Sequence, residues 1–162
     1  MKQILRTVLR AAIITVVFGF MGLGVNALSS KGIPWIYTAP TELVIAGLKV
    51  PLVDEKEAFK FFNDGSTVFL DTRREDDYRD QHIKGAFLLS PDDVQEQFLA
   101  VQPLLPEDNR IIMYCYGPEC DMAERVAEFL APLGYRNLMI MTAGLRAWEQ
   151  AGHPIEGEGK KK

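Results

Sequence analysis

The longest uninterrupted apolar segment of the chain lies near its N-terminus, where residues 11–28 contain no charged side chain. These 18 positions reach the length of about 17–25 residues that a helix needs to cross a bilayer. Three basic residues precede the segment and one follows it closely. Because the more basic flank stays in the cytoplasm, we expect residues 1–28 to form a single-pass membrane anchor, with the N-terminus cytoplasmic and the domain periplasmic or extracellular.

A cleaved signal peptide is the alternative interpretation of this segment. Val25-Asn26-Ala27 fits the pattern of small residues that precedes a cleavage site, and the protein would then be secreted or periplasmic. The apolar run is longer than the roughly 7–15 residues usual in signal peptides, which favours the uncleaved anchor. A buried core helix is disfavoured because no polar face interrupts the run.

After the anchor, the pattern changes twice. Residues 29–48 mix Ser, Gly, Pro and aromatic positions without a period, which predicts a linker. Residues 49–156 alternate short apolar runs, typical of buried strands, with amphipathic helical segments, and residues 157–162 read as a disordered tail. The apolar runs are 68–70, 86–89, 111–114 and 138–141, and the helical segments are 54–62, 75–80, 91–101, 121–133 and 144–151. This alternation predicts a three-layer α/β/α domain with a parallel sheet covered on both faces.

Charge narrows the classes of partner. Lys2, Arg6 and Arg10 account for three of the 18 basic residues, so the rest of the chain carries 15 against 22 acidic residues. An acidic domain is unsuited to DNA, RNA or anionic membrane surfaces, and we expect no nucleic-acid partner. Two cysteines are also too few for a disulfide scaffold, so their placement matters more than their number.

Cys115 occupies the position that most suggests chemistry. It directly follows the apolar run 111–114 and opens a short polar turn, and a helical pattern begins at Asp121. Inward-pointing amides of such a loop and the dipole of the following helix both favour the thiolate, which is the nucleophilic form. Asp71 also ends a predicted strand, and ligands of parallel sheets bind beyond the carboxyl ends of strands. We therefore expect Asp71 and Cys115 to lie at one site.

Three motifs follow one another along the chain. The first runs through Asp71-Thr72-Arg73, Asp77-Tyr78 and His82-Ile83-Lys84-Gly85-Ala86, the second is the loop that begins with Cys115, and the third runs through Gly144, Ala147-Trp148 and Gly152-His153-Pro154-Ile155. With these motifs in this order, the chain resembles the rhodanese-like domain family over roughly residues 50–156. The first motif departs from the family only at Gln81, where glycine is usual, and at Asp77, where glutamate is usual.

The resemblance implies a five-stranded parallel sheet and a sulfurtransferase without cofactor or metal. Cys115 would accept a sulfane sulfur as a persulfide from a small-molecule or protein donor and pass it to a thiol acceptor, which is covalent catalysis. The loop amides would cradle the anion, with Gly117 allowing the turn. The loop residues so assigned are Tyr116, Gly117, Pro118, Glu119, Cys120 and Asp121.

Four residues of the first motif are expected to support this site. Contact of Asp71 and Arg73 with substrate is the alternative to the role that we expect, which is a structural ion pair between Arg73 and Asp77. We expect His82 to stabilise its loop by hydrogen bonds rather than to transfer protons.

The loop also departs from the family in its charge. Glu119 and Asp121 are acidic, and no basic residue lies between Cys115 and Arg125. Acids near a thiol disfavour the thiolate and repel a dianion such as thiosulfate, so a neutral or protein-bound persulfide donor is expected. The arginine with which phosphatases of this fold hold phosphate falls at Asp121, which argues against a phosphatase.

Cys120 lies five positions after Cys115 and leaves alternatives open. It is a candidate resolving thiol that attacks the persulfide, releases sulfide and leaves a disulfide, or it pairs with Cys115 directly in an oxidising compartment. Bridging requires Cα atoms within about 7 Å. An exported dithiol–disulfide redox protein and a non-catalytic binding module are therefore the competing hypotheses. A zinc site that adds His82 and His153 is disfavoured, because the histidines are far apart in sequence.

Overall fold

The N-terminal segment forms one long helix. The computed structural model of the protein describes residues 2–29, 40–105 and 108–159, and divides the chain into residues 1–39 and 40–162. Helix α1 spans Lys2–Leu28 and begins well before the uncharged segment that predicted it. Its residues Gln3–Leu28, with a mean hydropathy of 2.1, are long and apolar enough to cross a membrane or to act as a signal. Half of the predicted linker, residues 30–39, lies outside the described residues.

A β-hairpin opens the second unit, within the range predicted as linker. Strand β1 (Glu42–Ile45) pairs antiparallel with β2 (Leu48–Val53), and Ile45 lies opposite Leu48. The two-residue turn between them, Ala46 and Gly47, has φ angles of 50° and 79°, as the tight turns of hairpins require. The domain therefore begins near residue 40 rather than at residue 49.

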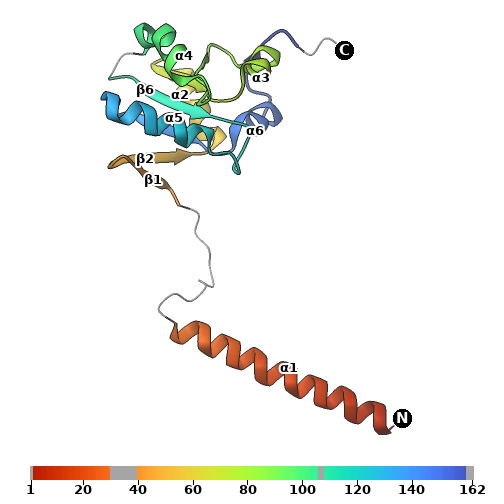
Figure 1. The fold of residues 1–162 in the computed structure, drawn as a ribbon. Helices are drawn as coiled ribbons and strands as arrows, with labels where there is room; N and C mark the ends of the chain where they lie inside the picture. Colours follow the sequence, from red (N-terminus) through yellow and green to blue (C-terminus); the bar gives the residue numbers. More distant parts are fainter. Residues whose placement is uncertain (1, 30–39, 106–107, 160–162) are drawn as a thin grey trace. The chain divides into compact units, whose positions relative to one another are not determined.

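A six-stranded sheet forms the centre of the domain (Figure 1). Its order is β1-β2-β7-β6-β3-β5, and all neighbouring pairs except β1–β2 are parallel. The predicted five-stranded parallel sheet is thus present, with the antiparallel β1 added at one edge. The remaining strands are β3 (Thr67–Asp71), β5 (Phe87–Leu88), β6 (Arg110–Tyr114) and β7 (Leu138–Met141).

Helices cover both faces of this sheet. The helices are α2 (Glu55–Asp64), α3 (Glu75–Asp80), α4 (Val94–Val101), α5 (Met122–Leu130) and α6 (Gly144–Gln150), and 3₁₀ turns follow α4 at Gln102–Leu104 and α5 at Ala131–Leu133. Asp54 caps α2 by accepting a 2.8 Å hydrogen bond from the amide of Glu57. Helix α4 begins at Val94, three residues later than predicted, because residues 91–93 form a turn.

Alternate residues of the central strands pack into two separate cores, one on each face of the sheet, which confirms the three-layer architecture. In β6, Ile111 and Met113 pack with α4 and α5, whereas Ile112 and Tyr114 pack with α2 and α6. The period of two is what strands buried on both faces require. On the α6 side Trp148 is fully buried among aromatic rings and donates to the carbonyl of Pro154 at 2.9 Å.

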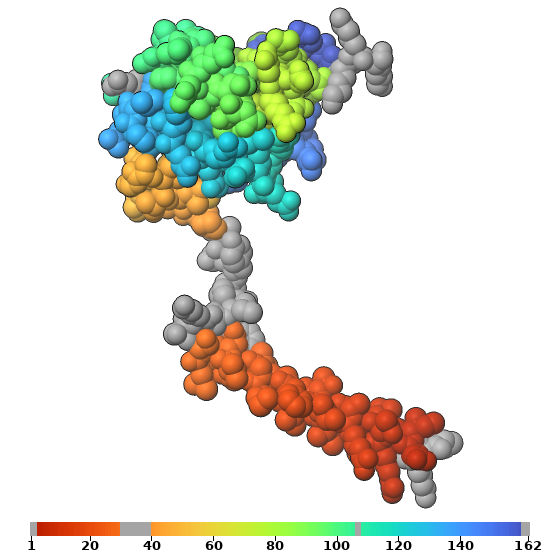
Figure 2. All heavy atoms as spheres, viewed as in Figure 1, coloured from red at the N-terminus to blue at the C-terminus, as the bar shows by residue number. Residues whose placement is uncertain are grey.

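The chain after α6 returns to the domain, and Glu158 and Gly159, which were predicted to belong to a disordered tail, are hydrogen-bonded to α3. Strand β8 (Ile155–Glu156) pairs antiparallel with β4 (His82–Ile83). Beyond it, the amides of Glu158 and Gly159 donate to α3 carbonyls at 2.8 and 3.0 Å. Figure 2 shows the blue C-terminal residues beside the yellow-green α3. The rest of the predicted tail, residues 160–162, lies outside the described residues.

Candidate functional site

Cys115 lies at the carboxyl end of β6, a central strand with β3 on one side and β7 on the other. Asp71 ends β3 directly opposite Tyr114, so the two predicted strand ends do meet at one edge of the sheet. Both residues are buried: Cys115 is 3% exposed and Asp71 is inaccessible. The thiol position is therefore set by the sheet, not by a free loop.

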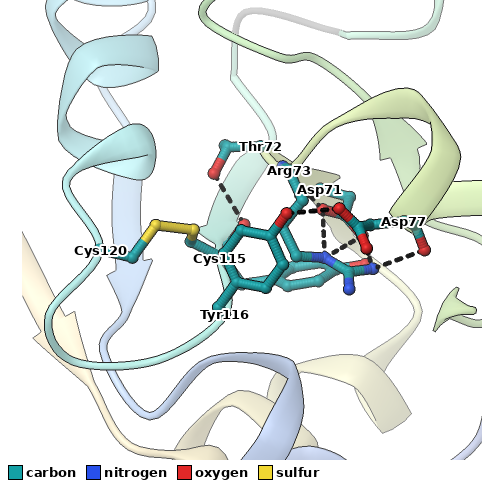
Figure 3. Close-up of a disulfide and its surroundings, with 8 residues drawn as sticks. Asp71, Thr72, Arg73, Asp77, Cys115, Tyr116 and Cys120 are labelled. Atoms are coloured by element: carbon teal, nitrogen blue, oxygen red, sulfur yellow. Dashed lines mark hydrogen bonds and ion pairs between the residues drawn. A yellow bond between two sulfur atoms is a disulfide. The ribbon is translucent and has the colours of Figure 1, made fainter.

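The loop after β6 is closed by a disulfide between Cys115 and Cys120 (Figure 3). Their Cα atoms are 6.3 Å apart, within the range that a disulfide can bridge. Inside the loop, the amide of Cys120 donates to the carbonyl of Gly117 at 3.1 Å, so this amide does not face the predicted anion cradle. Asp121 stands at the N-cap position of α5, and its side chain makes no capping bond.

Gly144, at the start of α6, holds the first half of the loop by close approach. Its φ is 66°, and a Cβ there would lie 2.5 Å from Gly117 N and 2.7 Å from the carbonyl oxygen of Cys115. The next amide, of Leu145, donates to that same carbonyl at 2.9 Å. Gly117 itself does not have a positive φ, so the glycine that the turn requires is Gly144 rather than Gly117 as predicted.

Arg73 forms its ion pair with Asp71, which corrects the predicted pairing with Asp77. The guanidinium donates to both carboxylate oxygens of Asp71, with Nη2 2.7 Å from Oδ2, and both side chains are buried. The same Nη2 also donates to the carbonyls of Gln81 at 2.5 Å and Asp77 at 3.3 Å. Burial opposes the charge, but the hydrogen bond and the charge of Asp71 outweigh it and raise the pKa of Arg73. Arg73 pairs with Asp71 rather than Asp77 because the carboxylate of Asp71 is wholly buried and would otherwise lack a cation.

Tyr116 connects the cysteine loop to α3. Its hydroxyl donates to the carboxylate of Asp77 at 2.5 Å, and the guanidinium of Arg73 lies 5.4 Å from its ring centroid (Figure 3). Burial, followed by the hydrogen bond to Asp77, raises the pKa of Tyr116, so it remains a protonated donor. The side-chain contact of Tyr116 with Asp77 was not predicted, because 39 residues separate the two in the sequence.

His82 makes hydrogen-bond contacts through both ring nitrogens. Its Nδ1 is 2.7 Å from the carbonyl oxygen of Tyr78, and its Nε2 is 3.3 Å from Glu156. The ring also stacks on Tyr78. Both nitrogens are thus engaged away from the cysteine loop. Gln81, the departure from the family glycine, has an extended backbone that any residue adopts, and its side chain reaches Glu149 on α6.

A hollow of about 470 Å³ opens beside the loop. It is lined by Tyr116, Gly117, Pro118, Glu119, Cys120 and Arg146. Arg146, on α6, is the only cation among these lining residues. It was not predicted as a site residue, because it lies 31 positions after Cys115 in the sequence. Arg146 also lines a second hollow of about 280 Å³ on the α3 side of Tyr116. Among the described residues, no group of three His, Cys, Asp or Glu side chains is placed to hold a metal ion.

The fold and the loop together define an α/β domain that presents a cysteine at the end of a central parallel strand. The sequence model of the Rhodanese-like domain family matches residues 54–151, and the chain therefore belongs to that family. Helix α1 and the β1–β2 hairpin precede the matched region.

Individual relatives agree with this assignment. Thiosulfate sulfurtransferase GlpE of Haemophilus influenzae is 30% identical over 104 residues, which cover 64% of this chain and 92% of the relative. The uncharacterized protein YibN of Escherichia coli is 23% identical over 107 residues, covering 66% and 73%. The solution structure of the rhodanese-like domain of the Anabaena protein Alr3790 superposes with a TM-score of 0.57 at 24% identity, covering 69% and 83%, and supports the fold.

Replacing Arg73 tests the buried ion pair. Arg73→Met is expected to lower the free energy of unfolding by about 3–5 kcal/mol, because it leaves the buried carboxylate of Asp71 unpaired. The control is Arg125→Met, which removes an exposed arginine 3.8 Å from Asp92 and should cost less than about 1 kcal/mol. Urea unfolding of the detergent-solubilised full chain measures both. Similar small losses for the two variants would contradict the role given to Arg73.

A pair of glycine variants tests the contact between α6 and the loop. Gly144→Ala and Gly134→Ala both place a side chain at positive φ, 66° and 103°, but only at Gly144 would the new Cβ meet backbone. We expect Gly134→Ala to cost about 1–2 kcal/mol from backbone strain. Gly144→Ala should cost about 3 kcal/mol or more, because the loop must move as well. Equal losses in urea unfolding would mean that the loop tolerates the displacement.

Proposed function

We propose that this protein is a sulfurtransferase in which Cys115 carries a sulfane sulfur as a persulfide and passes it to a thiol acceptor. The observation that carries the proposal is the position of Cys115: it stands at the first loop position after β6, in a domain of the rhodanese-like family. A relative named thiosulfate sulfurtransferase, 30% identical over nearly its whole length, supports the same class of reaction.

The proposed cycle has two sulfur-transfer steps. The Cys115 thiolate attacks the outer sulfur of a donor R–S–S⁻, an S–S bond forms on Cys115, and the donor leaves as a thiolate. An acceptor thiolate then removes that sulfur. Where no acceptor is present, the Cys120 thiolate attacks the Sγ of Cys115 and expels the outer sulfur as sulfide. This reduces the sulfane sulfur and oxidises the two thiols to the disulfide.

The charges around the loop favour a singly charged donor. Arg146 and Glu119 both line the hollow beside Cys120, and their charges offset each other. A dianion such as thiosulfate therefore gains less there than it would in a loop that itself carries basic residues. A small or protein-bound persulfide matches this balance better.

A second candidate is a dithiol–disulfide redox function of the same two cysteines. The disulfide between Cys115 and Cys120 favours it, because a pair that closes within one loop can exchange electrons with other thiols. The two functions differ in one species: only the sulfurtransferase forms a persulfide on Cys115.

For the N-terminal segment we propose an uncleaved anchor with the domain outside the cytoplasm. The length and hydropathy of α1 support a bilayer span, and the basic residues at its start support a cytoplasmic N-terminus. An exported domain also accounts for a disulfide, because oxidising compartments preserve such bonds.

Intact mass spectrometry tests the proposed chemistry. The detergent-solubilised full chain is reduced, freed of reductant and exposed to a persulfide donor or to thiosulfate, beside Cys115→Ser and Cys120→Ser variants. We expect a one-sulfur adduct that disappears in Cys115→Ser and lives longer in Cys120→Ser, which cannot resolve it. No adduct on any of the chains, together with a loss of two hydrogens that needs both cysteines, would replace sulfur transfer by the redox function.

Fusions test the anchor. A reporter enzyme that is active only outside the cytoplasm, fused after residue 39, is expected to be active, and a reporter active only inside is expected to be silent. The mass of the membrane-extracted protein should include residues 2–27. Activity of the cytoplasmic reporter alone would contradict export, and a mass that lacks residues 1–27 would identify a cleaved signal.

A further inference from the structure

The two sulfurs of the disulfide are unequally open to a reducing thiol. Cys115 is only 3% exposed, whereas Cys120 is half-buried. Cys120 lines the 470 Å³ hollow beside the loop, together with Tyr116, Glu119 and Arg146, and Cys115 is not among the lining residues. A thiol that enters this hollow therefore meets the sulfur-bearing residue Cys120 first.

The packing around the loop keeps Cys115 covered. Its carbonyl accepts the amide of Leu145, and the absence of a Cβ at Gly144 lets α6 press directly on the backbone of residues 115–117. On the opposite side Tyr116 is tied to Asp77 and lies over Arg73. Among the described residues, Cys120 has no comparable contacts: its backbone amide bonds within the loop, to the carbonyl of Gly117. Exposing Cys115 would require several of these contacts to break.

We propose that the disulfide is reduced by attack on Cys120, so that Cys115 is the leaving group. This inference rests on the proposed function, in which the disulfide ends one cycle and has to be reduced before the next. A thiolate RS⁻ attacks the Sγ of Cys120, the Cys115–Cys120 bond breaks, and Cys115 departs as a thiolate while Cys120 carries the mixed disulfide Cys120–S–S–R. A second thiolate then attacks the R sulfur, releases R–S–S–R and returns Cys120 as a thiol.

This order of events suits the next sulfur-transfer step. Cys115 is released first and lies at the end of β6, in the loop that leads into the N-terminus of α5, where the helix dipole favours a thiolate. A leaving thiolate that is stabilised in this way also departs faster. While Cys120 is capped by R, it cannot attack a new persulfide on Cys115, so the first sulfur loaded after reduction is protected from loss as sulfide.

The site of the mixed disulfide tests the proposal directly. The oxidised full-length chain in detergent is treated with glutathione, quenched in acid at short times, and alkylated with a maleimide. Proteolytic cleavage after Glu119 separates the two cysteines into different peptides. We expect glutathione on the Cys120 peptide and maleimide on the Cys115 peptide, in at least a tenfold excess over the reverse when extrapolated to zero time. The reverse pattern, or equal amounts of both, would overturn the proposal.

A matched pair of variants tests the route through the hollow. Arg146→Trp fills the hollow from α6, whereas Arg136→Trp makes the same exchange in the exposed segment before β7, at the amino end of the sheet. We expect Arg146→Trp to slow reduction by glutathione about tenfold and Arg136→Trp to leave it unchanged. Equal rates for both variants, or a disulfide that resists glutathione until the protein is unfolded in urea, would contradict entry through the hollow.

The two proposals can fail independently. Glutathione on Cys120 without any persulfide adduct on Cys115 would remove sulfur transfer but keep the direction of reduction. A persulfide adduct on Cys115 together with glutathione on Cys115 would do the opposite.

Discussion

The ion pair between Asp71 and Arg73 connects the end of a central strand to most of what surrounds Cys115. Burying two charges is costly, and the cost is offset only when geometry and further hydrogen bonds satisfy both groups. Here the carboxylate accepts from the backbone amide of Arg73 as well as from its guanidinium. The guanidinium in turn donates to two carbonyls around α3 and lies near the ring of Tyr116. One buried cation thereby fixes β3, α3 and the cysteine loop relative to one another.

The cysteine loop is held on two sides, by polar contacts on one side and by steric contact on the other. On the α3 side, the contacts are polar: the hydroxyl of Tyr116 donates to Asp77 above the Arg73 guanidinium. On the α6 side, the constraint is steric, because only glycine at position 144 lets the helix start approach the loop backbone so closely. Both constraints act on residues 115–117, and the hollow is bordered by the loop from Tyr116 to Cys120 but not by Cys115. The two cysteines of the disulfide therefore differ in access: Cys115 is held by these contacts, whereas Cys120 lines the hollow.

The features that the sequence predicts well are those encoded locally. The run 111–114 is apolar at every position because both faces of β6 are buried, and this identified the strand and the cysteine after it. The hairpin escaped prediction because its turn, Ala46-Gly47, has alanine where asparagine or aspartate gives the usual signal. The ion partner of Arg73 and the role of Arg146 depend on tertiary placement. Sequence spacing favours Asp77 as the ion partner of Arg73, whereas burial selects Asp71. Arg146 comes from a helix and lies 31 positions after Cys115 in the sequence.

Under the proposed function, sulfur transfer and disulfide exchange are successive rather than competing uses of this cysteine pair. In the proposed cycle, a persulfide on Cys115 has to survive beside the thiol of Cys120, five residues away. Whether the sulfur is kept or lost as sulfide depends on whether Cys120 is free to attack. With Cys115 clamped and Cys120 at the hollow, an incoming thiol would engage Cys120 and leave Cys115 as the free nucleophile. The proposed location outside the cytoplasm favours oxidation of the pair, and the same geometry would then offer a route back to the proposed sulfur-accepting state that does not require the buried end of the loop to open.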